Sequence, residues 1–261
     1  MIPAVSATAT LVAWFDGGDV NSDGTTVTDG AAISTWKDKS GKGHDATGSG
    51  AVAMASALNG RGVMDLRGQT SMLFSLGSPT TSYTIFTVQY GKSSSDYQRL
   101  LNGYTDQILL YGFYAGTTKW LTGYLDGDNF GINVNTPLID MGNRWSLANL
   151  IVRGDTKTSI SAVDGTLQDN IYWNFVNALE TVEIGSQRYN GVQYWQGYVA
   201  EILVYTGTVS TSDRETMEGY LAWKWGLQNS LPASHPYKSS SPSTTYGTII
   251  IIIIVVIFLK F

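Results

Sequence analysis

Short runs in which apolar and polar residues alternate recur along most of the chain, and this period of two predicts β-strands. The clearest run spans residues 83–90, with Ile85 facing inward. The same pattern predicts further strands at residues 11–15, 62–66, 72–75, 99–101, 108–114, 120–125, 144–152, 159–163, 181–185 and 196–205. About ten strands joined by Gly-containing turns match a two-sheet antiparallel jelly-roll sandwich.

A helical pattern follows the last predicted strand, over residues 212–228. Ser212, with Glu215 three residues later, predicts a capping box at the start of this helix. Apolar residues then recur at helical spacing and predict one buried face: Met217, Tyr220, Leu221 and Trp225. Pro232 and Pro236 are expected to end the helix and begin an extended tail, because proline cannot continue the helical hydrogen bonding.

A second motif lies near the N-terminus and reads W-x-D-x-S-G-x-G-x-x-A: Trp36, Asp38, Ser40, Gly41, Gly43 and Ala46. Asp38 and Ser40 can bond neighbouring amides in a tight turn, and glycine allows the positive φ that such a turn needs. Together with the C-terminal strand and helix, this motif resembles the concanavalin A-like lectin/glucanase superfamily, in its LamG-like jelly-roll form. The resemblance covers about residues 9–238 and implies an all-β, two-sheet antiparallel jelly-roll sandwich with one C-terminal helix. It implies little about function, because this superfold hosts lectins, hydrolases, adhesins and structural modules.

Length and composition limit the number of domains and the kinds of partner and site that this chain can have. The 261 residues suffice for one β-domain, which we place at residues 1–237. The net charge is −5 and basic runs are absent, which argues against a nucleic-acid partner. The chain has no cysteine, so disulfides, thiolate metal sites and cysteine nucleophiles are excluded.

The C-terminus has a different composition. A Ser/Pro-rich linker at residues 238–247 precedes a hydrophobic segment at residues 248–261. The run from Ile249 to Leu259 predicts a membrane anchor, at a cell or virion surface or at a virion internal membrane. We recognise no signal peptide, so we expect insertion after synthesis, with the domain in the cytosol or the virion interior, which fits an internal membrane better. Two alternatives remain for this run, a strand that packs or assembles and a GPI signal.

An acidic loop is the one candidate metal site. Asp19, Asn21 and Asp23 alternate and Gly24 follows in sixth position, as in a loop that wraps calcium. The twelfth position is Gly30 rather than the glutamate of a complete calcium loop. Ca²⁺ is therefore a candidate cofactor, and the alternative is a polar loop stabilised by Asx-turns, which the Asp/Asn/Gly-rich inserts of the resembling family favour.

Signals for catalysis are weak. Glucanases of the superfamily carry an E-x-D-x-x-E strand that places two carboxylates together, and this sequence lacks it. Glu180 and Glu183 stand three residues apart, which puts them on opposite faces of a strand. The two histidines, His44 and His235, are far apart, and the common hydrolase motifs are absent. We therefore expect no enzymatic activity.

Carbohydrate binding would use aromatic faces together with amide or carboxylate groups. The candidates are Trp120, Tyr124, Asn129, Trp173, Tyr189 and Trp195. Trp173 and Tyr189 are favoured because they adjoin loops rich in Asn, Gln and Gly, whereas aromatic residues inside strands are more often part of the core.

The leading hypothesis is a non-catalytic module that binds a carbohydrate or a surface partner, tethered to a membrane or particle. Its partner would be a glycan or glycoprotein. The alternative is a minor capsid, envelope or cell-surface assembly protein that packs against neighbouring structural subunits. A divergent glycoside hydrolase is a third reading.

Overall fold

The computed structural model describes residues 2–92, 97–103, 107–113, 116–126, 139–168, 171–172, 178–186 and 193–243. The strands are β1 (Ala9–Asp16), β2 (Ala32–Trp36), β3 (Ala46–Leu58), β4 (Arg61–Asp65), β5 (Ser71–Thr80), β6 (Tyr83–Gly91), β7 (Gln98–Gly103), β8 (Gln107–Phe113), β9 (Trp120–Asp126), β10 (Trp145–Arg153), β11 (Thr158–Val163), β12 (Thr166–Leu167), β13 (Ile171–Tyr172), β14 (Leu179–Ile184) and β15 (Gly197–Gly207). One α-helix, α1 (Thr211–Trp225), and a short 3₁₀ helix, Gln228–Ser230, follow.

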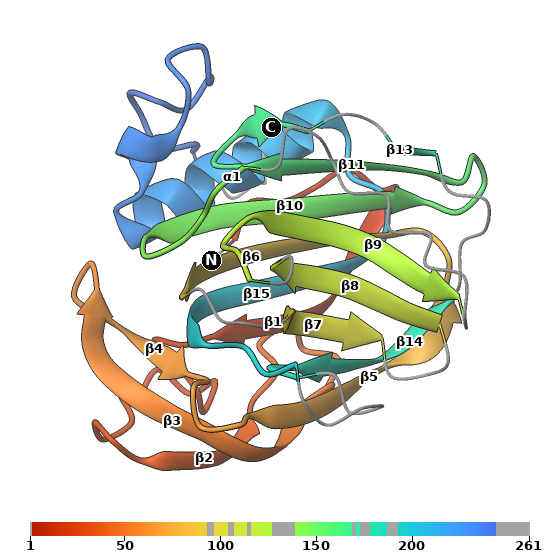
Figure 1. Ribbon diagram of the computed structural model, residues 1–261. Helices are drawn as coiled ribbons and strands as arrows, with labels where there is room; N and C mark the ends of the chain where they lie inside the picture. The colour runs from red at the N-terminus through yellow and green to blue at the C-terminus, as the bar shows by residue number, and fades with distance from the viewer. Residues whose placement is uncertain are drawn as a thin grey trace, which may run out of the picture.

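The strands form one continuous, curled sheet (Figure 1). Its main path runs β12-β11-β10-β6-β15-β4-β3-β5-β14-β7-β8-β9, and every pairing between these strands is antiparallel. The all-β prediction with one C-terminal helix is therefore confirmed. The described hydrogen bonds link the strands into a single sheet, where the sequence predicted two.

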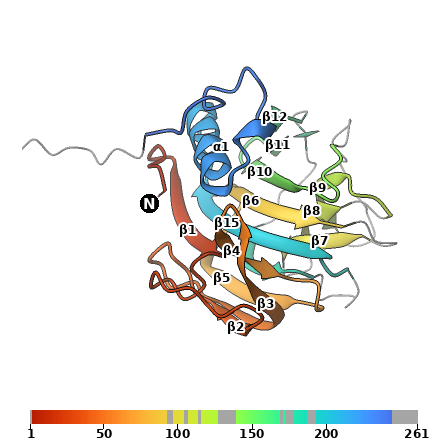
Figure 2. The same ribbon diagram turned by 90° about the vertical axis from the view of Figure 1, so that its left-hand side faces the viewer.

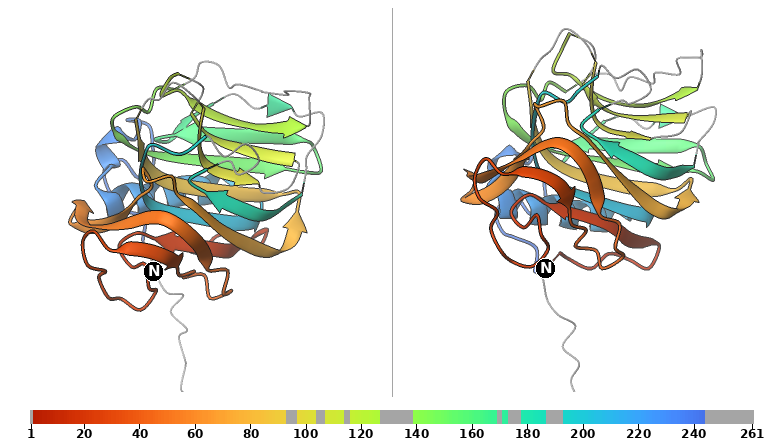
Figure 3. Two further views of the ribbon diagram at one scale, coloured as in Figure 1. Left: turned by 60° about the horizontal axis from the view of Figure 1, so that its bottom comes forward. Right: turned by 90° about the horizontal axis from the view of Figure 1, so that it is seen from below.

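Strand β3 is the place where the sheet curls. Its residue Val52 pairs with β2 on one side and with β4 on the other. Thr47, further back in the same strand, pairs with β2 on one side and with β5 on the other. Strands β4 and β5 therefore pair with different parts of the same edge of β3, and β2 pairs with the other edge. Figure 3 shows β2 and β3 along one side of the molecule.

Two apolar clusters lie on opposite faces of the layer built by β10, β6 and β15. One cluster lies inside the curl, where the hydroxyls of Thr87 on β6 and Tyr111 on β8 meet at 2.8 Å. The other packs Met217, Leu221 and Trp225 of α1 against the outer face of that layer. Figure 2 shows α1 on one side of this layer and β7, β8 and β9 on the other.

The turn at residues 37–45, which contains most of the N-terminal motif, covers the free edge of β1. Asp38 Oδ1 accepts hydrogen bonds from the backbone N–H groups of Trp14 and Ser40, at 2.9 and 2.8 Å. The N–H of Lys39 donates to the carbonyl of Trp14 at 2.8 Å. Gly41 and Gly43 adopt φ of 80° and 77°, as the sequence motif predicted. The motif therefore satisfies backbone groups that an open sheet edge would leave unpaired.

The helix begins at Thr211, and its N-cap lies two residues before the predicted one. Its N-cap is Ser210, whose side chain accepts from the N–H of Asp213 at 3.1 Å, while the Asp213 carboxylate accepts from the N–H of Ser210. The predicted box of Ser212 and Glu215 is wrong. Asp213 has an additional tie to the rest of the fold, because it accepts the hydroxyl of Ser6 at 2.6 Å.

The helix also ends earlier, at Trp225, where Gly226 adopts a left-handed φ of 74°. The predicted apolar face is confirmed, with Tyr220 half-buried at its margin. The tail after the helix folds back on it. Trp223 Nε1 donates to the carbonyl of Tyr237 at 2.9 Å, and the Tyr237 ring packs against Gly219.

The sequence located most strands but missed β2, β3, β12 and β13. Strand β3 is thirteen residues of mainly Ala, Gly, Ser and Met, which have low or neutral strand propensity. The turn at Asp164-Gly165, with φ of 49° and 77°, joins β11 to β12 as expected for a type I′ hairpin.

The predicted membrane location requires a correction. Among the residues that the structure describes, no helix is long and apolar enough to cross a bilayer, and no C-terminal anchor is seen. The run from Ile249 to Leu259 lies outside the described residues.

Replacing the observed cap tests where the helix begins. We expect Ser210→Ala to lower the free energy of unfolding by about 1 kcal/mol, because the N–H of Asp213 loses its acceptor. Ser212→Ala, the matched control, removes the same hydroxyl from an exposed position inside the first turn and should have little effect. Urea denaturation measures both values, and a larger loss for Ser212→Ala would contradict the observed cap.

Candidate functional site

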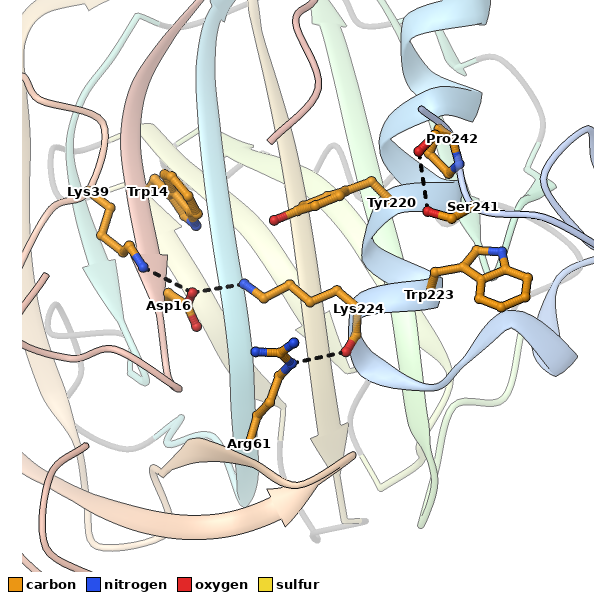
Figure 4. Close-up of a pocket in the computed structure, with 9 residues that line it drawn as sticks. All are labelled: Trp14, Asp16, Lys39, Arg61, Tyr220, Trp223, Lys224, Ser241 and Pro242. Carbon is orange, nitrogen blue, oxygen red and sulfur yellow. Dashed lines mark hydrogen bonds and ion pairs between the residues drawn. The ribbon is translucent and has the colours of Figure 1, made fainter. Parts of the chain in front are cut away.

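An open pocket of about 530 Å³ lies between β1, β4, the turn at residues 37–45, α1 and the tail (Figure 4). We call it the Trp14 pocket. Three aromatic side chains line it, Trp14 from β1 and Tyr220 and Trp223 from α1. All three are half-buried, so part of each ring is open to a ligand. Residues 241–242 of the tail complete the wall.

Charged side chains from four separate parts of the chain meet at the base of this pocket. Lys224 of α1 places its ammonium 2.8 Å from Asp16 Oδ2 and 2.8 Å from Glu201 Oε2. Lys39 reaches the same Asp16 oxygen at 3.2 Å and Asp19 at 2.5 Å. The helix, the first strand, the last strand and the turn are thus joined by one network of ion pairs.

The pKa values of the two carboxylates that share Lys224 are shifted in opposite directions. Burial alone would raise the pKa of Asp16, but Lys224 and Lys39 offset it and hold that pKa below its ordinary value. Glu201 is fully buried, and this burial raises its pKa more than Lys224 lowers it. The oxygens of Glu201 also accept the indole N–H groups of Trp14 and Trp225, at 2.7 and 2.5 Å.

Such a split between two carboxylates is also how glycosidases assign acid and base roles. Here Glu201 has no exposed surface, and its two oxygens are occupied by two indoles and an ammonium. Lys224 fills the space between the carboxylates. This pair therefore serves to fix α1 on the sheet.

Trp14 is fixed from three sides. Its indole N–H is bound to Glu201, and the ammonium groups of Lys39 and Lys224 lie 4.8 and 5.8 Å from its ring centroid. These distances are within the range of cation–π attraction. The ring therefore presents a fixed face to the pocket.

Arg61 stands at the rim, on the first residue of β4. Its Nε donates to the carbonyl of Lys224 at 3.3 Å, and its side chain is exposed. Among the described residues it forms no ion pair with a carboxylate. The lining thus contains three cations, Lys39, Arg61 and Lys224, and one carboxylate, Asp16.

The acidic loop lies beside this network. Asp19 Oδ1 accepts from the N–H groups of Asp23 and Gly24, at 3.1 and 3.0 Å, while its Oδ2 pairs with Lys39. Asp23 accepts from Thr25 through both N–H and hydroxyl. Asn21 is exposed. Within the described residues, no three His, Cys, Asp or Glu side chains are grouped to hold a metal. Calcium binding at this loop stays a prediction.

The predicted sugar-binding aromatics do not meet in the described structure. Trp120 is 2% exposed and packs in the inner core against Tyr111, with ring centroids 4.5 Å apart. Trp195 is fully buried as well. Tyr124 lies on β9, and its side chain is not described. Asn129, Trp173 and Tyr189 lie outside the described residues, so their role stays a prediction.

The sequence analysis missed the Trp14 pocket because it expected aromatic residues inside strands to belong to the core and did not consider the aromatic residues of the helix as ligand contacts. A signal existed: Trp14 belongs to the motif-bearing N-terminal segment, and Lys224 interrupts an aromatic helix face. Sequence reasoning also left open the role of Glu183, which is fully buried while Glu180 is exposed. Glu183 Oε1 accepts the hydroxyls of Ser71 and Ser186, each at 2.6 Å.

Comparison with known proteins relates the chain to solved structures only. Neither a protein-family model nor a curated protein matches it. Domain 4 of a GH43 extracellular arabinanase from Geobacillus stearothermophilus, solved with arabinotriose, has a TM-score of 0.53 at 14% identity, over 79% of this chain and 97% of that one. The binding domain of Paraclostridial Mosquitocidal Protein 1 has a TM-score of 0.54 at 12% identity, over 80% and 52%.

Trypanosoma rangeli sialidase is also similar, with a TM-score of 0.50 at 13% identity, over 78% of this chain and 32% of that one. At these identities the likeness shows the fold alone, a β-sandwich-like fold found in carbohydrate-binding and glycoside-active proteins. The family-level LamG resemblance is not reproduced. These neighbours correct the prediction that the protein is not an enzyme. They come from solved glycosidases, so this fold gives no ground for excluding enzymatic activity.

The ion-pair network predicts a particular dependence of stability on pH. Asp16→Asn should lower the free energy of unfolding at pH 7 by about 2 kcal/mol, because Lys224 and Lys39 lose a charged acceptor. The folded-state pKa of Asp16 is depressed, so its contribution is present above its ordinary pKa and lost as pH falls through the folded value. The difference from wild type should therefore shrink towards about pH 2.

Denaturation curves at several pH values measure this difference. Asp65→Asn is the control, because its pair with Arg67 is solvent-exposed and should contribute less than about 1 kcal/mol. An Asp16→Asn loss that is independent of pH would contradict the charged role of Asp16.

Proposed function

We propose that the curled sheet is a jelly-roll sandwich of the concanavalin A-like kind and that the domain binds glycans in the Trp14 pocket. The observation that carries this proposal is the pocket itself, where three partly open aromatic rings stand beside fixed charged groups. The fold likeness to an arabinanase domain solved with arabinotriose supports the ligand class.

The chemistry of the lining suits a sugar. The faces of Trp14 and Trp223 offer apolar surface for the C–H side of a pyranose or furanose ring. At the rim, the terminal guanidinium nitrogens of Arg61 can donate hydrogen bonds of the charge-assisted kind to a sugar oxygen. A volume of about 530 Å³ falls in the range of small-molecule sites and has room for a short oligosaccharide.

Removing one ring tests the location of the site. We expect Trp223→Ala to weaken oligosaccharide binding at least about tenfold, since an aromatic contact of this size contributes on the order of 1.4 kcal/mol. Trp145→Ala is the matched control: Trp145 is also half-buried but stacks on Tyr198 away from the pocket. Glycan-array screening followed by calorimetry on the hits measures both variants. Equal binding by wild type and Trp223→Ala would place the site elsewhere.

We retain calcium as a proposed ligand of the loop that contains Asp19, Asn21 and Asp23. The ion would have to displace the Lys39 ammonium, which lies 2.5 Å from Asp19. We therefore expect calcium to raise the melting temperature of Lys39→Met more than that of wild type. Asp23→Asn should reduce the rise, and a melting temperature indifferent to calcium in all three proteins would reject the site.

Assembly with neighbouring structural subunits stays a prediction.

A further inference from the structure

We propose that the Trp14 pocket selects an anionic saccharide, one that carries carboxylate or sulfate groups, and that Arg61 is the residue that recognises its charge. This inference rests on the proposed glycan-binding function of the same pocket and adds the class of ligand.

The charge of the lining is the first observation. Three cations and one carboxylate line the pocket, although the chain as a whole carries a net charge of −5. Asp19 and Glu201, which lie just outside the lining, pair with Lys39 and Lys224. Arg61 is the lining cation that pairs with no described carboxylate, and such a cation in a cleft attracts an anionic ligand.

The availability of the three cations is the second observation. Lys39 is bound to Asp16 and Asp19, and Lys224 is bound to Asp16 and Glu201, so both ammonium groups are already compensated. Arg61 uses only its Nε, in a bond to a backbone carbonyl, and that leaves the two terminal nitrogens for a ligand. A guanidinium with two free nitrogens matches the two oxygens of a carboxylate or sulfate in a bidentate geometry.

Position is the third observation. Arg61 follows the β3–β4 hairpin turn Asn59-Gly60, where both residues have positive φ, 47° and 69°. Asn59 donates to the same Lys224 carbonyl as Arg61, at 3.0 Å. The hairpin is therefore fixed to the end of α1, and Arg61 and Tyr220 lie on opposite sides of the Lys224 side chain (Figure 4).

Paired ligands that differ only in charge test this proposal on the full chain. Oligogalacturonate and its methyl ester present the same sugars with and without carboxylates, and dextran sulfate and dextran do the same for sulfate. We expect wild type to bind the charged member of at least one pair about tenfold more tightly, with the difference reduced in high salt.

Two arginine variants separate recognition from general electrostatics. Arg61→Gln should lose about tenfold in affinity for the charged ligand and change less than about twofold for the neutral one. Arg67→Gln removes the same charge from a residue that lies outside the pocket and pairs with Asp65, and it should bind as wild type does. Arg61→Lys keeps the positive charge but lacks the two terminal nitrogens of a guanidinium, so its affinity for the charged ligand should lie between those of Arg61→Gln and wild type. Circular dichroism checks that each variant is folded.

The outcomes distinguish the two proposals. Equal binding of charged and neutral ligands, or equal losses in Arg61→Gln and Arg67→Gln, would overturn the anion selectivity while leaving a glycan-binding pocket in place. Binding of none of these ligands, nor of arabino-oligosaccharides on a glycan array, would overturn the glycan-binding function and the selectivity together.

Discussion

The position of one ammonium group governs much of this structure. Lys224 lies in the last turn of α1, where the helix dipole favours a cation, and it reaches two carboxylates on β1 and β15. A carboxylate as buried as Glu201 is costly unless its oxygens are satisfied, and Lys224 with the indoles of Trp14 and Trp225 satisfies them. The docking of the helix, the orientation of Trp14 and the floor of the pocket are therefore parts of one arrangement.

The turn at residues 37–45 connects that arrangement to the edge of the sheet. Asp38 binds the backbone of β1 and so closes an edge that could otherwise pair with another chain. The same turn brings Lys39 over the ring of Trp14 and onto Asp16. The residues that close the sheet and the residues that shape the pocket are adjacent in sequence, which gives the motif W-x-D-x-S-G a structural meaning in this chain.

The sequence predicted a strand correctly where the alternation of apolar and polar side chains is strong. Alternating branched and aromatic residues located β6 and β15, whereas β3 escaped because its Ala, Gly and Ser residues carry no alternating signal and the strand is specified by its neighbours. The predicted N-cap was two residues too late because two overlapping cap sequences occur, and a contact from Ser6 favours the earlier one. Alternation also cannot tell the inside of a curled sheet from its outside, so Trp120 was taken for a ligand contact although it is core. The Trp14 pocket joins residues 14, 39, 61 and 224, and only the fold brings them together.

The charged groups of the pocket differ in whether a carboxylate or an ammonium group of the protein already pairs with them. Asp16, Lys39 and Lys224 are each bound to partners that hold elements together, so a ligand that used their charge would compete with the fold. Arg61 makes its contact through a backbone carbonyl, which fixes the side chain but leaves its charge uncompensated by any described carboxylate. A side chain that the fold holds in place while its charge stays unpaired is suited to ligand recognition, because it loses less conformational entropy when the ligand binds. The aromatic rings and the ion-pair network form a fixed surface, and the proposed selectivity for an anionic saccharide depends on Arg61, whose charge no described carboxylate neutralises.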